Sequence, residues 1–460
     1  MSKIYEIKLP FKLVKRYVVF TFKRFYSEFI VTGQENIPTG SPVIFAPNHI
    51  NALMDALAVH AVIPKNMPLV FLARSDIFKN KHMARILNFV KIMPTFRMRD
   101  GIENLDKNNG IFERCVDILD HNATIGIMPE GNQGERQQLR PLVKGIFRIA
   151  FAAQQKYGIQ PGVKIVPVGI HLGHFVKCGK HIIINIGKPI EVSEFMETYN
   201  ENPVLATNQI RSRLRQEIIN LSLDLATPDY YFCFRSAVKI AKYPYLQEHG
   251  IPDSTYNRFV ARQKIAKKLV DIEKNQPGII EELELQCTQY EKNLSTLNLR
   301  DWVFDKLPHT LTETALESLR LLVTLPVFLV GFATNILPFT VPVYLRKHVF
   351  KVKDWGFFSS VHFLLGSLAF PFFYLVETAV FYHLSPFPWW VSGVFLTILY
   401  PVGKMSLRWY KDFLKLLARF RFRRLLRTKP GLVAETAELK KHITRMVLHC
   451  QKLQKKEVQC

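Results

Sequence analysis

The chain has 460 residues, of which 48% are hydrophobic, and it carries a formal net charge of +24. Its length predicts a catalytic domain with at least one further segment. Excess positive charge first suggests a nucleic-acid binder, but this composition is too apolar for that class and no recognition motif accompanies the charge. The six cysteines show neither CxxC nor metal-ligand spacing, which predicts reduced thiols and no metal site.

Residues 1–30 have the pattern of an amphipathic helix. Phenylalanine and valine recur at steps of three and four from Phe11 to Phe29, with lysine and arginine between them. The basic residues also interrupt every apolar run, so no cleavable signal is expected. Two interpretations stay open: this face lies on a membrane surface, or it packs on its own domain.

Residues 31–200 alternate short apolar runs with stretches of helical length. The runs are residues 43–46, 69–73, 124–128, 164–170 and 181–187. This alternation predicts an α/β fold, a mostly parallel sheet covered by helices. Catalytic and ligand-binding residues in such sheets lie in the loops that follow the carboxyl ends of strands. His49 follows the first run by three residues, and Glu130 follows the third by two.

His49 and Asp55 form the first candidate pair. A neutral imidazole is suited to take the proton of an attacking alcohol, and a carboxylate beside it fixes its tautomer and stabilises the imidazolium. Asp55 reaches His49 if residues 50–54 curl from the strand end into the start of a helix. Such a pair needs no serine or cysteine nucleophile.

The block at residues 128–145 is the second candidate. Glu130 and Gly131 lie at a turn that a backbone could use to approach a ligand, with Glu130 holding acceptor hydroxyls. Basic side chains suited to a phosphate come next, ahead of a helix: Arg136, Arg140 and Lys144. Two further blocks are residues 92–101, with Arg97, and residues 165–174, with Pro167 and two histidines that we interpret as structural.

In this order the blocks NHINALMD, PTFRMRD, PEG and VPVGI resemble the four motifs of the glycerophospholipid acyltransferase family, over about residues 30–195. The resemblance implies a role for each matching residue: His49 as catalytic base, Asp55 orienting it, Arg97 with Glu130 and Gly131 binding the glycerol phosphate of the acceptor, and Pro167 with Asn48 on the acyl-donor side.

The sequence departs from that pattern twice. The pair is His-x5-Asp, one residue longer than the common form, and so resembles the branch of glycerol-3-phosphate/dihydroxyacetone-phosphate acyltransferases. After PEG the family usually has Thr/Ser-Arg-Ser, whereas this chain has Asn132, Gln133 and Gly134. An arginine often used for phosphate is therefore missing, and Arg136, Arg140 or Lys144 would replace it.

Residues 201–310 predict a helical hairpin region, with a turn at residues 274–278. Within the next part, 311–403, the stretches 321–345, 355–376 and 378–403 lack Lys, Arg, Asp and Glu. Each is near or above the roughly 20 residues of a bilayer span. They predict a membrane-embedded region, with a transmembrane hairpin over residues 355–403.

The charge flanking these stretches predicts an orientation. Residues 404–460 form a basic amphipathic tail with 16 Lys/Arg against 4 Asp/Glu, and the loop 346–354 is basic as well. Both are expected in the cytosol, against anionic lipid. A single crossing by 321–345 would place the N-terminal domain outside. Because prolines interrupt that stretch, we predict that it re-enters or bends at the interface, which leaves the catalytic domain cytosolic.

The predicted protein is a membrane-bound O-acyltransferase of phospholipid biosynthesis, without cofactor. It would move a fatty acyl group from acyl-CoA or acyl carrier protein to glycerol 3-phosphate or 1-acylglycerol 3-phosphate, by direct attack with backbone donors on the oxyanion. Two alternatives stay open. The acceptor is another lysophospholipid or an amine-containing lipid, or the chain is a lipid-binding scaffold that works through its basic residues 413–426.

Overall fold

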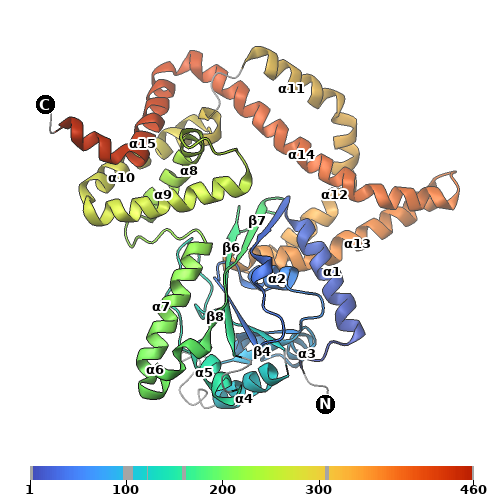
Figure 1. Cartoon of the computed structure of the whole chain (residues 1–460). Helices are drawn as coiled ribbons and strands as arrows, with labels where there is room; N and C mark the ends of the chain where they lie inside the picture. The colour runs from blue at the N-terminus through green and yellow to red at the C-terminus, as the bar shows by residue number, and fades with distance from the viewer. Residues whose placement is uncertain (1–3, 97–106, 122, 158–161, 306–309, 458–460) are drawn as a thin grey trace. The chain divides into compact units, whose positions relative to one another are not determined.

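The computed structural model describes every residue except 1–3, 97–106, 122, 158–161, 306–309 and 458–460 (Figure 1). It divides into two compact units. Met1–Asp224 and Val352–Phe363 form the first, here called the α/β unit. Leu225–Lys351 and Leu364–Cys460 form the second, here called the helical unit.

The α/β unit is built on one mostly parallel sheet, which confirms the predicted fold class. The strand order is β1-β7-β6-β2-β5-β3-β4, and β8 pairs with β6. Among the described strands, only the pairs that β6 makes with β7 and β8 are antiparallel. The strands are β1 (Glu28–Thr32), β2 (Val43–Pro47), β3 (Leu69–Arg74), β4 (Ile92–Thr95), β5 (Thr124–Gly126), β6 (Lys164–Leu172), β7 (His181–Ile186) and β8 (Ile190–Glu191).

The five predicted apolar runs coincide with β2, β3, β5, β6 and β7. The sequence did not predict β1 and β4, which lie at the two edges of the sheet. Edge strands are covered less completely than central ones: β1 has no buried residue and β4 has one. Their side chains therefore lack the near-continuous apolar pattern that marks a strand buried on both faces.

Helices cover both faces of this sheet. Successive side chains of a strand point to opposite faces, so Ile44 joins the core beneath α4, α5 and α7, whereas Phe45 joins the core beneath α1 and α2. The helices of this unit are α1 (Leu9–Phe25), α2 (Ala52–Val62), α3 (Lys81–Phe89), α4 (Lys107–Asp120), α5 (Gly145–Tyr157), α6 (Met196–Glu201) and α7 (Pro203–Leu221).

Helix α1 bears on both interpretations of the N-terminal segment. Phe11 and Phe22 are buried, and Phe22 belongs to the core over the sheet. Leu13, Tyr17 and Phe20 are 60%, 39% and 49% exposed. One side of the helix thus packs on its own unit, and an apolar row remains exposed; its contact with a membrane surface stays a prediction.

The helical unit contains the predicted pair α9 and α10, joined at Gln276. Near their far end, buried Asp301 accepts a hydrogen bond from the Tyr290 hydroxyl at 2.8 Å and pairs with Lys440 Nζ at 3.0 Å. The helices are α8 (Tyr231–Glu248), α9 (Thr255–Asn275), α10 (Pro277–Leu297), α11 (Leu311–Val323), α12 (Leu325–Tyr344), α13 (Phe358–Leu384), α14 (Trp389–Thr428) and α15 (Pro430–Glu457).

In the described part of the chain, three apolar helical stretches are long enough to cross a bilayer: Leu325–Val349, Trp355–Leu384 and Trp389–Thr428. Helix α12 is continuous, with Pro338 and Pro342 inside it. Its re-entry or bending at the interface stays a prediction. Helix α13 begins in the α/β unit and continues into the helical unit.

Candidate active site

The His49 loop is anchored to the sheet through Asn48. The Asn48 main-chain N–H donates to Val168 O at 3.1 Å, which continues the pairing of β2 with β6 by one residue. Its buried side chain donates to Ile170 O at 3.1 Å and accepts from Ile170 N at 2.6 Å. Asn48 therefore acts here as a fixed support beside His49, and its predicted place on the acyl-donor side stays a prediction.

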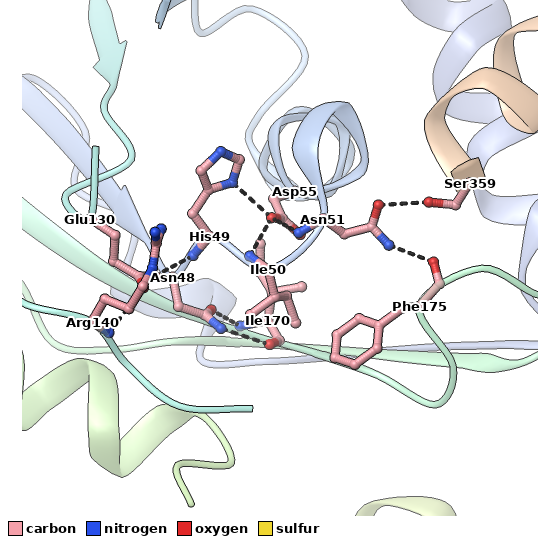
Figure 2. Close-up of polar contacts among 10 residues, drawn as sticks. All are labelled: Asn48, His49, Ile50, Asn51, Asp55, Glu130, Arg140, Ile170, Phe175 and Ser359. Atoms are coloured by element: carbon pink, nitrogen blue, oxygen red, sulfur yellow. Dashed lines mark hydrogen bonds and ion pairs between the residues drawn. The ribbon is translucent and has the colours of Figure 1, made fainter. Parts of the chain in front are cut away.

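Asp55 meets the His49 ring because the chain turns into α2 directly after the strand. The distance from Nδ1 of His49 to Oδ2 of Asp55 is 3.0 Å. The main-chain N–H groups of Ile50 and Asn51 donate to the same oxygen at 2.8 and 2.6 Å. An ionised Asp55 requires the proton on Nδ1, which leaves Nε2 free to accept one. Nε2 points away from Asp55 (Figure 2).

The two partners differ in exposure. The side chain of Asp55 is 0% exposed and that of His49 is 15% exposed. A buried carboxylate is stable when donors surround it, and Asp55 has three on one oxygen. The pair therefore combines a fixed, buried carboxylate with a partly exposed imidazole.

The turn between His49 and α2 contains a residue with a left-handed backbone conformation. Asn51 precedes α2 with φ −150° and ψ 63°, and Ala52 has φ +34°, a region that L-residues rarely adopt. This turn brings the Asp55 carboxylate to the His49 ring.

Glu130 clamps the main chain of His49. Its Oε1 accepts from His49 N at 2.6 Å, and its Oε2 accepts from Arg140 N at 3.0 Å and Arg140 Nε at 3.2 Å. Gly134 N donates to His49 O at 3.0 Å, so the loop after β5 holds both sides of one residue. Burial raises the pKa of Glu130, and the donors from His49 and Arg140 oppose that rise. Contact of Glu130 with an acceptor hydroxyl stays a prediction.

Gly131 has to be glycine at this turn. Its φ is +67°, and a Cβ would lie 3.1 Å from Cγ1 of Val143. The predicted phosphate ligands Arg136 and Lys144 are exposed. Arg140 differs from them, because Glu130 fixes its guanidinium and its Nη2 is buried without a hydrogen-bond partner among the described residues.

Two predicted residues remain to be considered. Arg97 falls outside the described residues. Pro167 is buried in β6 opposite Ala46, and its carbonyl accepts from Gly187 N at 2.9 Å. A contact of Pro167 with the acyl donor stays a prediction. Among the described residues no group of three or more His, Cys, Asp and Glu is placed to hold a metal ion.

The sequence did not single out Asn51, which is 1% exposed. Its side-chain N–H donates to Phe175 O at 2.6 Å, and its Oδ1 accepts from the Ser359 hydroxyl at 2.6 Å (Figure 2). An asparagine two residues after a candidate histidine was a visible signal. No such sequence signal marked Ser359, because it lies 308 positions after Asn51 in the chain.

Comparison with known proteins identifies relatives of this part of the chain. Residues 28–171 match the family model named Acyltransferase. Over 316 residues, the chain is 23% identical to glycerol-3-phosphate O-acyltransferase 2 of Saccharomyces cerevisiae, covering 66% of this chain and 39% of that protein. It is 24% identical over 201 residues to the 1-acyl-sn-glycerol-3-phosphate acyltransferase of Borreliella burgdorferi, covering 42% of this chain and 73% of that protein.

A solved structure is also similar to part of the chain. It is the 1-acyl-sn-glycerophosphate acyltransferase PlsC of Thermotoga maritima, 18% identical with a TM-score of 0.33, and it covers 45% of this chain and 78% of that one. The chain spans about two fifths of the length of the yeast relative. The region that matches the family model, residues 28–171, contains β2, His49, Asp55 and Glu130. Residues 28–171 thus form an acyltransferase domain, and its relatives include glycerol-3-phosphate and 1-acylglycerol-3-phosphate acyltransferases.

Proposed function

We propose that this protein is a membrane-bound O-acyltransferase that acylates glycerol 3-phosphate or 1-acylglycerol 3-phosphate. The observation that carries the proposal is the His49–Asp55 pair, with a buried carboxylate on Nδ1 and an outward-facing Nε2. The names of the relatives support both acceptors, one from yeast and one from a bacterium. Acyl-CoA or acyl carrier protein is the proposed donor.

The proposed reaction is a direct transfer. His49 Nε2 takes the proton of the acceptor hydroxyl as its oxygen attacks the thioester carbon, and Asp55 stabilises the imidazolium. The tetrahedral adduct then collapses, the C–S bond breaks, and the thiolate leaves and takes up the proton. The products are an ester and a free thiol, with no change in redox state.

For the acceptor phosphate we propose Arg140 as a ligand. Its carboxylate partner Glu130 also binds the His49 main chain, so the guanidinium and the imidazole share one support. Charge-assisted hydrogen bonds from a guanidinium are the strong, geometrically defined contacts that phosphates make in proteins. Arg140 thereby replaces the arginine that the family usually has directly after PEG, and this favours a phosphate acceptor over one without phosphate.

The membrane is the proposed site of action. Three apolar helical stretches and the exposed row Leu13, Tyr17 and Phe20 on α1 support attachment to a bilayer. The basic tail, residues 404–460, supports contact with anionic lipid. By the same charge rule, we propose that the catalytic domain faces the cytosol.

The first test replaces His49 by alanine in the full chain, purified in detergent. One labelled acyl-CoA is supplied with a mixture of glycerol 3-phosphate and 1-acylglycerol 3-phosphate, and mass spectrometry identifies the lipid product. Loss of a general base is expected to lower kcat roughly 100- to 10,000-fold. His82→Ala, at an exposed position of α3, is the matched control. Turnover retained by His49→Ala would falsify the proposed role.

The second test concerns the acceptor. Arg140→Met keeps much of the side-chain length without the charge and is expected to raise the KM for phosphate acceptors about tenfold or more. Arg148→Met, at an exposed position of α5, is the control and should leave that KM unchanged. A panel that includes acceptors without phosphate completes the measurement. Activity on those acceptors alone would contradict a phosphate substrate.

A further inference from the structure

Residues Val352–Phe363 lie against the His49 loop, although they follow it by about 300 positions in the sequence. They belong to the α/β unit and are here called the strap. Asp354 Oδ2, at one end of the strap, accepts from Gln133 Nε2 at 2.9 Å. Phe363, at the other end, contacts Phe22 edge-to-face with ring centroids 5.9 Å apart. The strap is therefore held both by the loop that follows β5 and by the core under α1.

Between these ends the strap meets both partners of the Asn51 side chain. Trp355 packs edge-to-face on Phe175, with ring centroids 5.1 Å apart, and the carbonyl of Phe175 accepts from Asn51 Nδ2. Ser359 donates its hydroxyl to Asn51 Oδ1 at 2.6 Å. Ser359 and Asn51 are 2% and 1% exposed, so little water can replace either contact.

Three hydrogen bonds, linked through the covalent structure of Asn51, lead from the strap to the imidazole. Ser359 donates to Asn51, the main-chain N–H of Asn51 donates to Asp55 Oδ2, and Asp55 accepts from His49 Nδ1. Asn51 precedes the left-handed Ala52, so the backbone here has an unfavourable conformation that surrounding contacts must maintain. Without the Ser359 hydroxyl, Asn51 would keep a buried acceptor with no donor, which disfavours its present orientation.

We propose that Ser359 is a positioning residue of the acyltransferase site, acting through Asn51 on the orientation of Asp55 and His49. Its hydroxyl donates to Asn51 and not to the His49–Asp55 pair, so we assign it no catalytic role. The proposal rests on the proposed function for its kinetic consequence, but its structural consequence, the placement of the His49 ring, does not depend on any substrate. A small misplacement of a general base affects the chemical step more than ground-state binding.

The kinetic test uses Ser359→Ala in the full-length enzyme, with acyl-CoA and glycerol 3-phosphate. We expect kcat to fall about tenfold while both KM values stay within about twofold. Ser360→Ala is the matched control, since Ser360 is 4% exposed and its hydroxyl has no hydrogen-bond partner among the described residues. Ser359→Thr keeps a hydroxyl and should recover most of the loss. Equal thermal midpoints verify that all variants fold.

A double-mutant cycle separates positioning from general packing. If Ser359 acts through Asn51, Asn51→Ala combined with Ser359→Ala should lose no more kcat than Asn51→Ala alone. Losses that multiply would show that Ser359 acts by another route and would overturn the proposal. An unchanged kcat in Ser359→Ala would overturn it as well.

A substrate-free measurement keeps this test distinct from the proposed function. Diethyl pyrocarbonate modifies accessible imidazoles, and mass spectrometry of the peptide that contains His49 gives its rate at fixed pH. We expect Ser359→Ala to change that rate about threefold or more and Ser360→Ala to leave it unchanged. If no variant transfers acyl groups but this difference appears, the proposed function fails and the positioning role stands. Equal rates in the two variants would reject the positioning role.

Discussion

Asp55 concentrates three donors on a single oxygen, two from the main chain and one from the imidazole. The two main-chain donors compensate for burial of this carboxylate oxygen. Because those donors belong to Ile50 and Asn51, the residues that link histidine to helix, the loop and the carboxylate fix each other. A change in this loop is therefore expected to alter the position of the His49 imidazole.

His60, on the same helix, provides a prediction about pH. Burial, together with the nearby charge of Lys15, lowers the pKa of His60 to about 3 from its ordinary value of 6.5. The folded chain thus binds fewer protons than the unfolded chain between these values, so His60 contributes stability above pH 6.5 that is lost as the pH falls. The loss is at most about 1.4 kcal/mol per pH unit.

The measurement is the thermal midpoint of the detergent-solubilised protein from about pH 7.5 to about pH 5, a window on both sides of the ordinary histidine pKa. His60→Phe keeps a ring against Phe71, whose centroid lies 5.5 Å from that of His60, but it cannot take up a proton. We expect the midpoint of this variant to fall less with pH than that of the unsubstituted protein. Parallel curves would show that His60 does not titrate in this way.

Among the helices, close packing of α12 on α14 depends on small residues. A Cβ on Gly331 would lie 2.6 Å from Val402 O, and a Cβ on Gly403 would lie 2.4 Å from Asn335 Oδ1. Trp409 Nε1 also donates to Leu321 O at 3.0 Å, shortly before α12. Glycine lets apolar helices approach closely where the hydrophobic effect cannot drive them together.

Gly331→Leu is therefore expected to separate the two helices and to destabilise the helical unit by about 1–3 kcal/mol. Gly393→Leu makes the same change on α14, where a Cβ would meet no described atom within 4 Å, so it serves as the control. Thermal unfolding in detergent compares the two variants. A similar midpoint for both would contradict the dependence on Gly331.

Across the whole molecule, the strap constrains the membrane topology. The chain leaves the α/β unit after Asp224 and rejoins it at Val352. Both points belong to one compact unit, which we propose to lie on one side of a bilayer, so the intervening residues are expected to cross it an even number of times or not at all. Among their described residues only Leu325–Val349 is long and apolar enough to cross. This supports the prediction that residues 321–345 do not make a single crossing.

A reporter inserted at residue 312 tests this topology in intact cells or sealed vesicles. The expected position is cytosolic, the same as for a reporter at the basic C-terminal tail. A reporter at residue 386, between α13 and α14, is expected on the opposite side. An external signal from residue 312 would overturn the arrangement.

Local sequence was sufficient to predict the central strands, the three apolar stretches and the order of His49, Asp55 and Glu130. The periodicity and spacing of the residues predict these features, because burial on both faces of a sheet or in a bilayer requires apolar residues at short, regular intervals. The edge strands β1 and β4 were not predicted, because their half-exposed side chains show no such period.

The distant groups that support the His49 loop were identified only from the folded structure. The fold brought Glu130 to the main chain of His49 and to the Arg140 guanidinium, and it placed Ser359 against Asn51. Such contacts depend on the path of the whole chain, and no local pattern relates two residues 308 positions apart. A hydrogen bond needs only one serine and one asparagine, which are common residues, so its partners are identified only when the fold brings them within about 3 Å.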